Sequence, residues 1–132
     1  MMGNARGTAG DAVPSLVDVE PLAQALAVFA RDRDWEQFHS PKNLVMALIG
    51  ETGELAEVFQ WMSEGDSKGA ASNPKTAQAV RDEMADVLMY LVRLADVLGV
   101  DLNEAVQSKI KTNANKYPAD KARGSSAKYT EM

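Results

Sequence analysis

Two pairs of acidic residues, each with a three-residue spacing, lie within the two most apolar stretches of the chain. Glu51 and Glu54 follow one apolar run, and Glu83 and Asp86 precede another. Residues three apart on a helix share a face, so each pair directs two carboxylates toward one place. Carboxylate oxygens are the preferred ligands of hard cations, and four of them would suit Mg²⁺ or Mn²⁺.

Glu51 is the most informative of these acids. At about 100° per residue it falls near the middle of an apolar stripe that includes Leu44, Leu48 and Leu55. An isolated carboxylate in such a surface is costly or becomes protonated, and a bound cation would remove that cost. Glu83 and Asp86 lie on the flank of their stripe, so for them a role as ordinary surface acids stays open.

Composition describes a small globular protein. The chain has 132 residues, 45% of them apolar and 25% charged, enough for one domain with a modest core. It contains no cysteine, which excludes disulfides and thiolate metal sites. Its apolar stretches are too short to span a bilayer, and its first residues lack the apolar core of a signal peptide. We therefore expect a soluble, cytoplasmic protein that does not bind membranes.

Charge is distributed unevenly along the chain. Residues 109–132 contain six basic and two acidic residues, whereas the rest of the chain carries nine net negative charges against an overall −5. An acidic body argues against binding of nucleic-acid polymers, which depends on broad phosphate neutralisation. The short basic segment could contact a small polyphosphate, or it could be a solvated terminal tail.

Periodicity and capping signals predict an all-α protein with four main helices: from 19 or 21 to 33, from 41 to about 63, from 74 to 98 and from 102 to before 118. We expect a disordered segment over 1–18, the helical domain over 19–118 and an irregular tail over 119–132. The helix that ends at Leu98 is apolar on nearly every side. It should be covered by neighbours, including another chain, so oligomerisation would complete the bundle.

Several motifs, in this order, resemble the MazG-like all-α nucleoside triphosphate pyrophosphatases, and most of all their dCTP pyrophosphatase group. The motifs are Arg33–His39, Pro41–Leu44, Gly50–Glu57, Phe59–Trp61, Glu83–Leu91, Lys109 with Asn113, Lys116–Pro118, and Gly124–Ser125 with Lys128–Thr130. Together they cover about residues 20–130. Gly50 occupies a position where the broader family often has an acid, which leaves the number of metal ions open.

The resemblance implies roles for three groups of residues. Metal coordination falls to Glu51, Glu54, Glu83 and Asp86. Apart from the resemblance, a carboxylate of this group could accept the proton of a water molecule, and Glu54 is our candidate. Phosphate binding falls to Lys109, Asn113, Lys116 and Tyr117, although lysines near the end of a helix also stabilise its dipole. Base binding falls to Trp35, Trp61 and Tyr90, which could instead be core or interface aromatics. His39, the only histidine, reads as a structural or capping residue.

The implied activity is Mg²⁺-dependent hydrolysis of a deoxynucleoside triphosphate to the monophosphate and pyrophosphate, with dCTP or a modified dCTP favoured. The implied role is cleansing of the nucleotide pool, and the implied assembly is a homotetramer built as a dimer of dimers. Three alternatives stay open: specificity for another or a noncanonical nucleotide, a di-iron carboxylate bundle, and a non-catalytic helical interaction module. The di-iron site normally needs Glu-x-x-His pairs, and neither acidic pair contains histidine.

Overall fold

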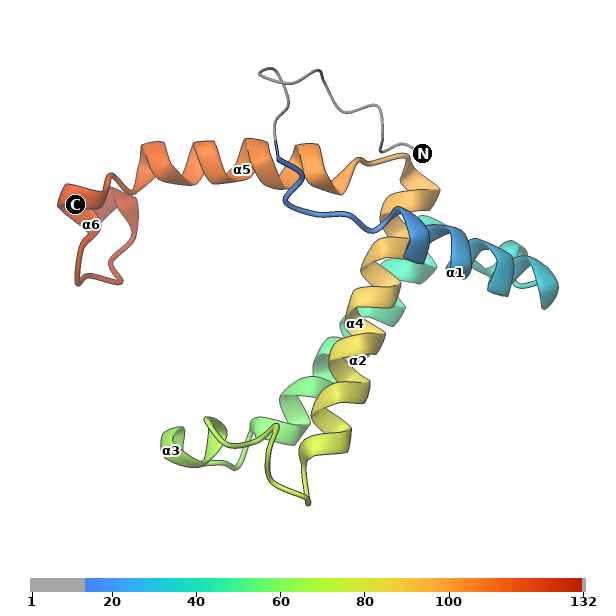
Figure 1. Cartoon of the computed structure of the whole chain (residues 1–132), viewed down its shortest axis with the longest axis horizontal. Helices are drawn as coiled ribbons and strands as arrows, with labels where there is room; N and C mark the ends of the chain where they lie inside the picture. The colour runs from blue at the N-terminus through green and yellow to red at the C-terminus, as the bar shows by residue number, and fades with distance from the viewer. Residues whose placement is uncertain (1–13, 132) are drawn as a thin grey trace. The chain divides into compact units, whose positions relative to one another are not determined.

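The computed structural model describes residues 14–131 (Figure 1). Within this range the chain is helical and contains no strand, which confirms the predicted all-α class. Its elements are α1 (Glu20–Asp32), η2 (Glu36–Phe38), α2 (Pro41–Phe59), α3 (Glu64–Ser67), α4 (Ala77–Leu98), α5 (Leu102–Lys116), α6 (Ala119–Ala122) and η3 (Tyr129–Glu131). None of the helices in the described part of the chain combines the length and hydropathy that crossing a bilayer requires.

Local sequence signals set most of the helix ends. Ser40 caps α2, because its Oγ accepts a hydrogen bond from the backbone N–H of Asn43 at 3.2 Å, and Pro41 occupies the first turn. Asp101 caps α5 in the same way, accepting from Glu104 N at 3.0 Å. Gly99 ends α4 in the left-handed conformation, with φ at 72°, which glycine adopts without steric cost.

The connection between α2 and α4 differs from the expectation in three respects. We expected α2 to reach Ser63, but it ends at Phe59, and Ser63 instead caps the short helix α3 in a segment expected to be a flexible loop. We also expected the next helix to begin at Pro74, but α4 begins at Ala77. Asn73 Oδ1 accepts from Lys75 N at 2.9 Å and the carbonyl of Asn73 accepts from Thr76 N at 2.9 Å, so residues 73–76 form a turn of their own before the helix begins.

The chain divides into two compact units. One contains Val19–Val100, where α2 and α4 run side by side as a helical hairpin and α1 packs against α4 (Figure 1). Its buried side chains are Ala23, Ala30, Leu44, Ala70, Val80, Val92, Arg93 and Ala95. Large apolar side chains nevertheless stay exposed on both hairpin helices, among them Met46 and Ile49 on α2 and Met84 and Leu88 on α4.

The second unit contains residues up to Asp18 and from Asp101 onward. Residues 14–18 belong to the segment expected to be disordered, and the rest of that segment lies outside the described residues. Here they are extended along α5, where Asn103 Oδ1 accepts from Leu16 N at 2.8 Å and from Val17 N at 3.1 Å. Gln107 Nε2 donates to the carbonyl of Pro14 at 3.0 Å. The C-terminal tail, expected to be irregular, contains α6 and η3.

Candidate active site and metal centre

The two acidic pairs meet on the helical hairpin. Glu51 on α2 and Glu83 and Asp86 on α4 each place a carboxylate oxygen within 4.8 Å of the others, and we call these three residues the carboxylate cluster. The packing of α2 along α4 accounts for this meeting, because each helix carries its acids on the side that faces its neighbour. Three oxygens at this separation are close enough to ligate a single cation.

Burial distinguishes this cluster from a group of surface acids. All three side chains are half-buried, and the Oε2 atoms of Glu51 and Glu83 are buried with no hydrogen-bond partner. A buried, unpaired carboxylate oxygen is costly, so such atoms are normally paired with a donor or a cation. The two unpaired oxygens therefore fit a hard divalent cation such as Mg²⁺ or Mn²⁺, which prefers oxygen ligands.

Glu54 stands one turn beyond Glu51 and is exposed, so it borders the carboxylate cluster without forming part of it. Glu54 is the largest influence on Glu51, because a hydrogen bond between the two carboxyl groups requires a proton on one of them, and together with burial it raises the pKa of Glu51 to about 7. Burial is the largest influence on Glu83 and, with Glu54 again contributing, raises the pKa of Glu83 as well. Without a cation, this group of acids therefore tends to retain a proton near neutral pH.

The three aromatic candidates belong to the same unit as the cluster. Tyr90 is half-buried on α4, one turn beyond Asp86. Trp61 follows the end of α2 and is 89% exposed, and Trp35 precedes η2 and is 45% exposed. Trp35 packs edge-on against Phe29 with ring centroids 5.8 Å apart. Two indoles with this much free surface are available to stack on a planar ligand.

The phosphate-binding candidates lie on or just after α5, in the other unit, and are not part of the helical hairpin. Lys109, Asn113 and Lys116 are exposed, and their spacing of four and three residues aligns them along one face of α5. Lys116 Nζ lies 4.9 Å from the centre of the Tyr129 ring, and Tyr117 packs edge-on against the same ring at 6.0 Å. These contacts give the end of α5 a local framework of its own.

Comparisons with known proteins agree with this arrangement. Residues 49–132 match the sequence profile of the MazG-like family. The chain is 50% identical over 119 residues to dCTP pyrophosphatase 1 of Rattus norvegicus and to that of Homo sapiens, which covers 90% of this chain and 68% of either relative. The chain belongs to the MazG-like family.

Two further similarities extend the comparison. This MazG-like chain is 44% identical over 140 residues to dCTP pyrophosphatase 1 of Bos taurus, covering 100% of the chain and 81% of that relative. A crystal structure of a pyrophosphatase from Archaeoglobus fulgidus superposes with a TM-score of 0.70 at 39% identity, covering 76% of this chain and 92% of the other. The fold implied by the motifs is thus confirmed.

Sequence reasoning missed one polar contact of this MazG-like chain. Arg93 of α4 is buried, and its Nε donates to His39 Nδ1 at 3.1 Å across 54 positions of sequence. The only local signal was a cation inside the most apolar helix of the chain. Burial, followed by the charge of Arg93, lowers the pKa of His39, whereas Glu36 acts in the opposite direction. His39 is therefore a tertiary partner of α4 in addition to preceding the helix cap.

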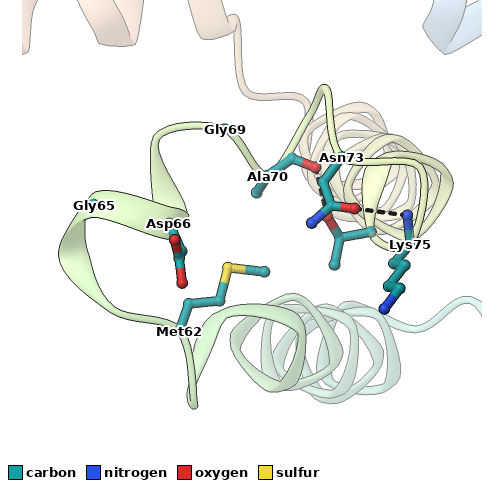
Figure 2. Close-up of a pocket in the computed structure, with 8 residues that line it drawn as sticks. Met62, Gly65, Asp66, Gly69, Ala70, Asn73 and Lys75 are labelled. Atoms are coloured by element: carbon teal, nitrogen blue, oxygen red, sulfur yellow. Dashed lines mark hydrogen bonds between the residues drawn. The ribbon is translucent and has the colours of Figure 1, made fainter.

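The connection between α2 and α4 also lines an open hollow, shown in Figure 2. The cavity has a volume of about 480 Å³ and is lined by Met62, Gly65, Asp66, Gly69, Ala70, Asn73, Lys75 and Thr76. Thr76 Oγ1 donates to the carbonyl of Ala70 at 2.7 Å, which ties the two sides of the connection together. None of the proposed site residues lines this cavity.

Proposed function

We propose that this chain is a metal-dependent nucleoside triphosphate pyrophosphatase. It hydrolyses a deoxynucleoside triphosphate, with dCTP or a modified dCTP favoured, to the monophosphate and pyrophosphate, and so cleanses the nucleotide pool. The observation that carries the proposal is the pair of buried, unpartnered oxygens on Glu51 and Glu83. The names of the relatives, dCTP pyrophosphatase 1, support the substrate.

Metal binding is assigned to the carboxylate cluster together with Glu54. When bound there, Mg²⁺, or Mn²⁺ as a substitute, would offset charge on the triphosphate and lower the pKa of a water molecule. The unpartnered oxygens of Glu51 and Glu83 supply buried ligand positions, and Asp86 supplies a third. Since all of these donors are oxygens, the set favours a hard cation.

The remaining steps are assigned to other side chains of the proposed site. Water attacks the α-phosphorus, and the bond from that phosphorus to the bridging oxygen breaks, so pyrophosphate leaves with the bonding electrons. Glu54 is exposed beside the cluster and accepts the proton of the attacking water. Lys109, Asn113, Lys116 and Tyr117 hold the leaving phosphates, while Trp35, Trp61 and Tyr90 hold the base.

An oligomer is part of the proposal. Leu88 and Leu91 of α4 are 47% and 40% exposed in the single chain, and Met46 and Ile49 of α2 are exposed further, at 58% each. Large apolar side chains on neighbouring helices favour burial against another copy. We propose a homotetramer, built as a dimer of dimers, that works in the cytoplasm on small nucleotides and binds no nucleic-acid polymer and no membrane.

A nucleotide panel tests the activity. The purified chain is incubated with Mg²⁺ and each deoxynucleoside and ribonucleoside triphosphate, including 5-modified dCTP and dUTP, and the products are resolved by chromatography. We expect pyrophosphate and the monophosphate, with the highest kcat/KM for dCTP or a modified dCTP. A preference for dUTP or for a nucleotide with another base would leave the proposed reaction unchanged and would identify a different substrate.

A matched pair of variants shows whether the carboxylate cluster performs the reaction. Glu83→Gln should abolish pyrophosphate release, whereas Glu57→Gln, which changes an exposed acid of α2 outside the cluster, should retain it. Orthophosphate as the first product, or no turnover of any nucleotide by the wild type, contradicts the proposal. In the latter case a melting temperature unmoved by millimolar Mg²⁺ would favour a non-catalytic interaction module.

A further inference from the structure

A side-chain hydrogen bond ties the connector between α1 and α2 to α4. Arg93 Nε donates to His39 Nδ1 at 3.1 Å, and Arg93 Nη1 lies 3.5 Å from Asp96 Oδ2. Arg93 is only 8% exposed, so its guanidinium is largely shielded from water. The imidazole accepts through Nδ1, which requires that this nitrogen carry no proton. The contact therefore holds only while His39 is neutral.

This contact lies one 3₁₀ turn from Trp35. Trp35 is the N-cap of η2 and His39 is its C-cap. Phe38 N donates to the carbonyl of Trp35 at 2.9 Å, and His39 N donates to the carbonyl of Glu36 at 3.1 Å. His39 is thus joined by its own backbone hydrogen bond to Glu36, and its neighbour Phe38 is joined to Trp35, the residue that carries the indole.

A second contact braces the same turn from α2. Asn43 Nδ2 donates to the carbonyl of Phe38 at 3.1 Å, so the turn is held by α2 on one side and by α4 through Arg93 on the other. The Trp35 indole is 45% exposed and its aromatic partner is Phe29, which is itself 46% exposed. Since little packs over the ring, its position depends on this backbone, which is held by these two contacts and by the bond from Trp35 N to the carbonyl of Ala30 at 2.8 Å.

We propose that Arg93 and His39 are positioning residues that hold Trp35 where its indole stacks on the base of the substrate, and that protonation of His39 releases this hold. The inference rests on the proposed function for the role of Trp35. The release of the connector itself concerns the protein alone and can be observed without substrate.

The direction of the pH effect follows from the groups around His39. The charged groups that face it are Arg93 and its partner Asp96 from α4, and Glu36 from η2. Ser40, the N-cap of α2, and Asn43 of α2, which donates to the carbonyl of Phe38, do not titrate. Burial and Arg93 place the pKa of His39 below 6.5, so the hold is complete near neutral pH and is lost on acidification. A protonated imidazole can no longer accept at Nδ1, and it repels the guanidinium.

Three variants separate positioning from a general effect on stability. In His39→Asn, the side-chain Oδ1 stands close to the position of Nδ1, so it can accept from Arg93 but cannot titrate. His39→Leu removes the acceptor and keeps an apolar body, and Arg93→Met removes the donor and keeps the length. Kinetics are measured at about pH 8, where His39 is neutral because its pKa is lowered from 6.5.

At that pH we expect His39→Leu and Arg93→Met to raise KM for dCTP about three- to tenfold while kcat stays near that of the wild type, because a stacking contact is weakened. His39→Asn should keep the wild-type KM. Equal KM values for His39→Leu and the wild type overturn the inference, and so does a His39→Asn protein as impaired as His39→Leu.

Tryptophan fluorescence supplies the readout that does not depend on turnover. In a Trp61→Phe background Trp35 is the only tryptophan. Its emission should change on acidification with a midpoint below 6.5, and the added His39→Asn change should abolish this transition. An identical transition with asparagine present overturns the inference even if His39→Leu does not fold. The wild type could hydrolyse no nucleotide and still show the His39-dependent change in Trp35 emission. That result would refute the proposed function but would support the positioning of Trp35 by His39 and Arg93.

Discussion

Glu51 on α2 and Glu83 on α4 each leave Oε2 buried without a hydrogen-bond partner, and their carboxylates lie within 4.8 Å of one another. Two acids in this position repel each other unless a proton or a cation lies between them. Hydrogen bonding to Glu54 and burial raise the pKa of Glu51 to about 7. In the metal-free protein near neutral pH, a bound proton therefore reduces the repulsion between the acids. The same side chains can therefore bind a proton or a metal ion, and the two compete.

Glu51→Gln should abolish turnover and preserve the fold. The neutral amide removes a metal ligand, and it is less costly to bury than an unpaired carboxylate. The metal-free variant should accordingly melt at or above the temperature of the metal-free wild type. Calorimetry in a chelator, together with a pyrophosphate-release assay in Mg²⁺, measures both effects. Near-wild-type activity of this variant would remove Glu51 from the metal site.

Stability of the metal-free protein should fall as pH rises through neutrality. The pKa of Glu51 is raised from 4.5 in the unfolded chain to about 7 in the folded one, so between these values the folded protein retains a proton that the unfolded chain has lost. This contribution is complete below the lower value and is lost above the upper one.

Mg²⁺ should act in the opposite sense over the same range, because it binds the deprotonated carboxylates. The rise in melting temperature on adding millimolar Mg²⁺ should thus be larger at about pH 8 than at about pH 5. Glu51→Gln serves as the control and should flatten the profile measured in chelator. A wild-type profile as flat as that of the variant would show that Glu51 titrates normally.

Lys116→Ala should weaken productive binding of the triphosphate. Loss of one charge-assisted contact costs on the order of 1.5–3 kcal/mol, or about ten- to a hundredfold in kcat/KM. Lys111→Ala is the matched control, because Lys111 is also exposed on α5 but projects about 140° away around the helix. Lys116→Ala should weaken binding of the monophosphate less than binding of the triphosphate, because the monophosphate lacks the outer phosphates. Equal losses of affinity for the triphosphate and the monophosphate would indicate that Lys116 contacts a part of the nucleotide other than its outer phosphates.

Leu91→Asp should prevent assembly and yield unfolded or aggregated protein. Leu91 is 40% exposed in the single chain, so an isolated chain would tolerate aspartate there. A charge buried against a second copy is costly. Misfolding or aggregation of the variant would therefore indicate that Leu91 is buried against another subunit. Light scattering coupled to size exclusion gives the mass of the wild type, and circular dichroism follows the variant. A wild type that is active as a monomer would refute the oligomer.

Local signals predicted the helices well where a cap defines the end. Ser40 and Asp101 begin α2 and α5, and Gly99 ends α4, as expected. Prediction failed where two local structures compete. Asn73 accepts from Lys75 N as a cap would, but Thr76 Oγ1 donates to the carbonyl of Ala70, and α4 begins only at Ala77. Sequence alone does not state which of these local hydrogen bonds is formed.

The meeting of the acidic pairs was predictable because it needs only helical periodicity and a hairpin. The contact between His39 and Arg93 was not, since it joins residues 54 positions apart and neither belongs to a motif that marks the other. The central place assigned to Glu51 in an apolar stripe agrees with its burial and raised pKa. The roles assigned to the phosphate-binding and base-binding residues stay predictions.

The short connection after α4 has a consequence for how such chains can change in length. Gly99 N donates to the carbonyl of Asp96, Val100 N donates to that of Ala95, and Asp101 caps α5, so each of the three residues completes a helix end. Between α2 and α4, by contrast, the longer connection is held mainly by hydrogen bonds within itself. Insertions and deletions acquired during divergence should therefore accumulate between residues 60 and 76 and be purged from 99–101.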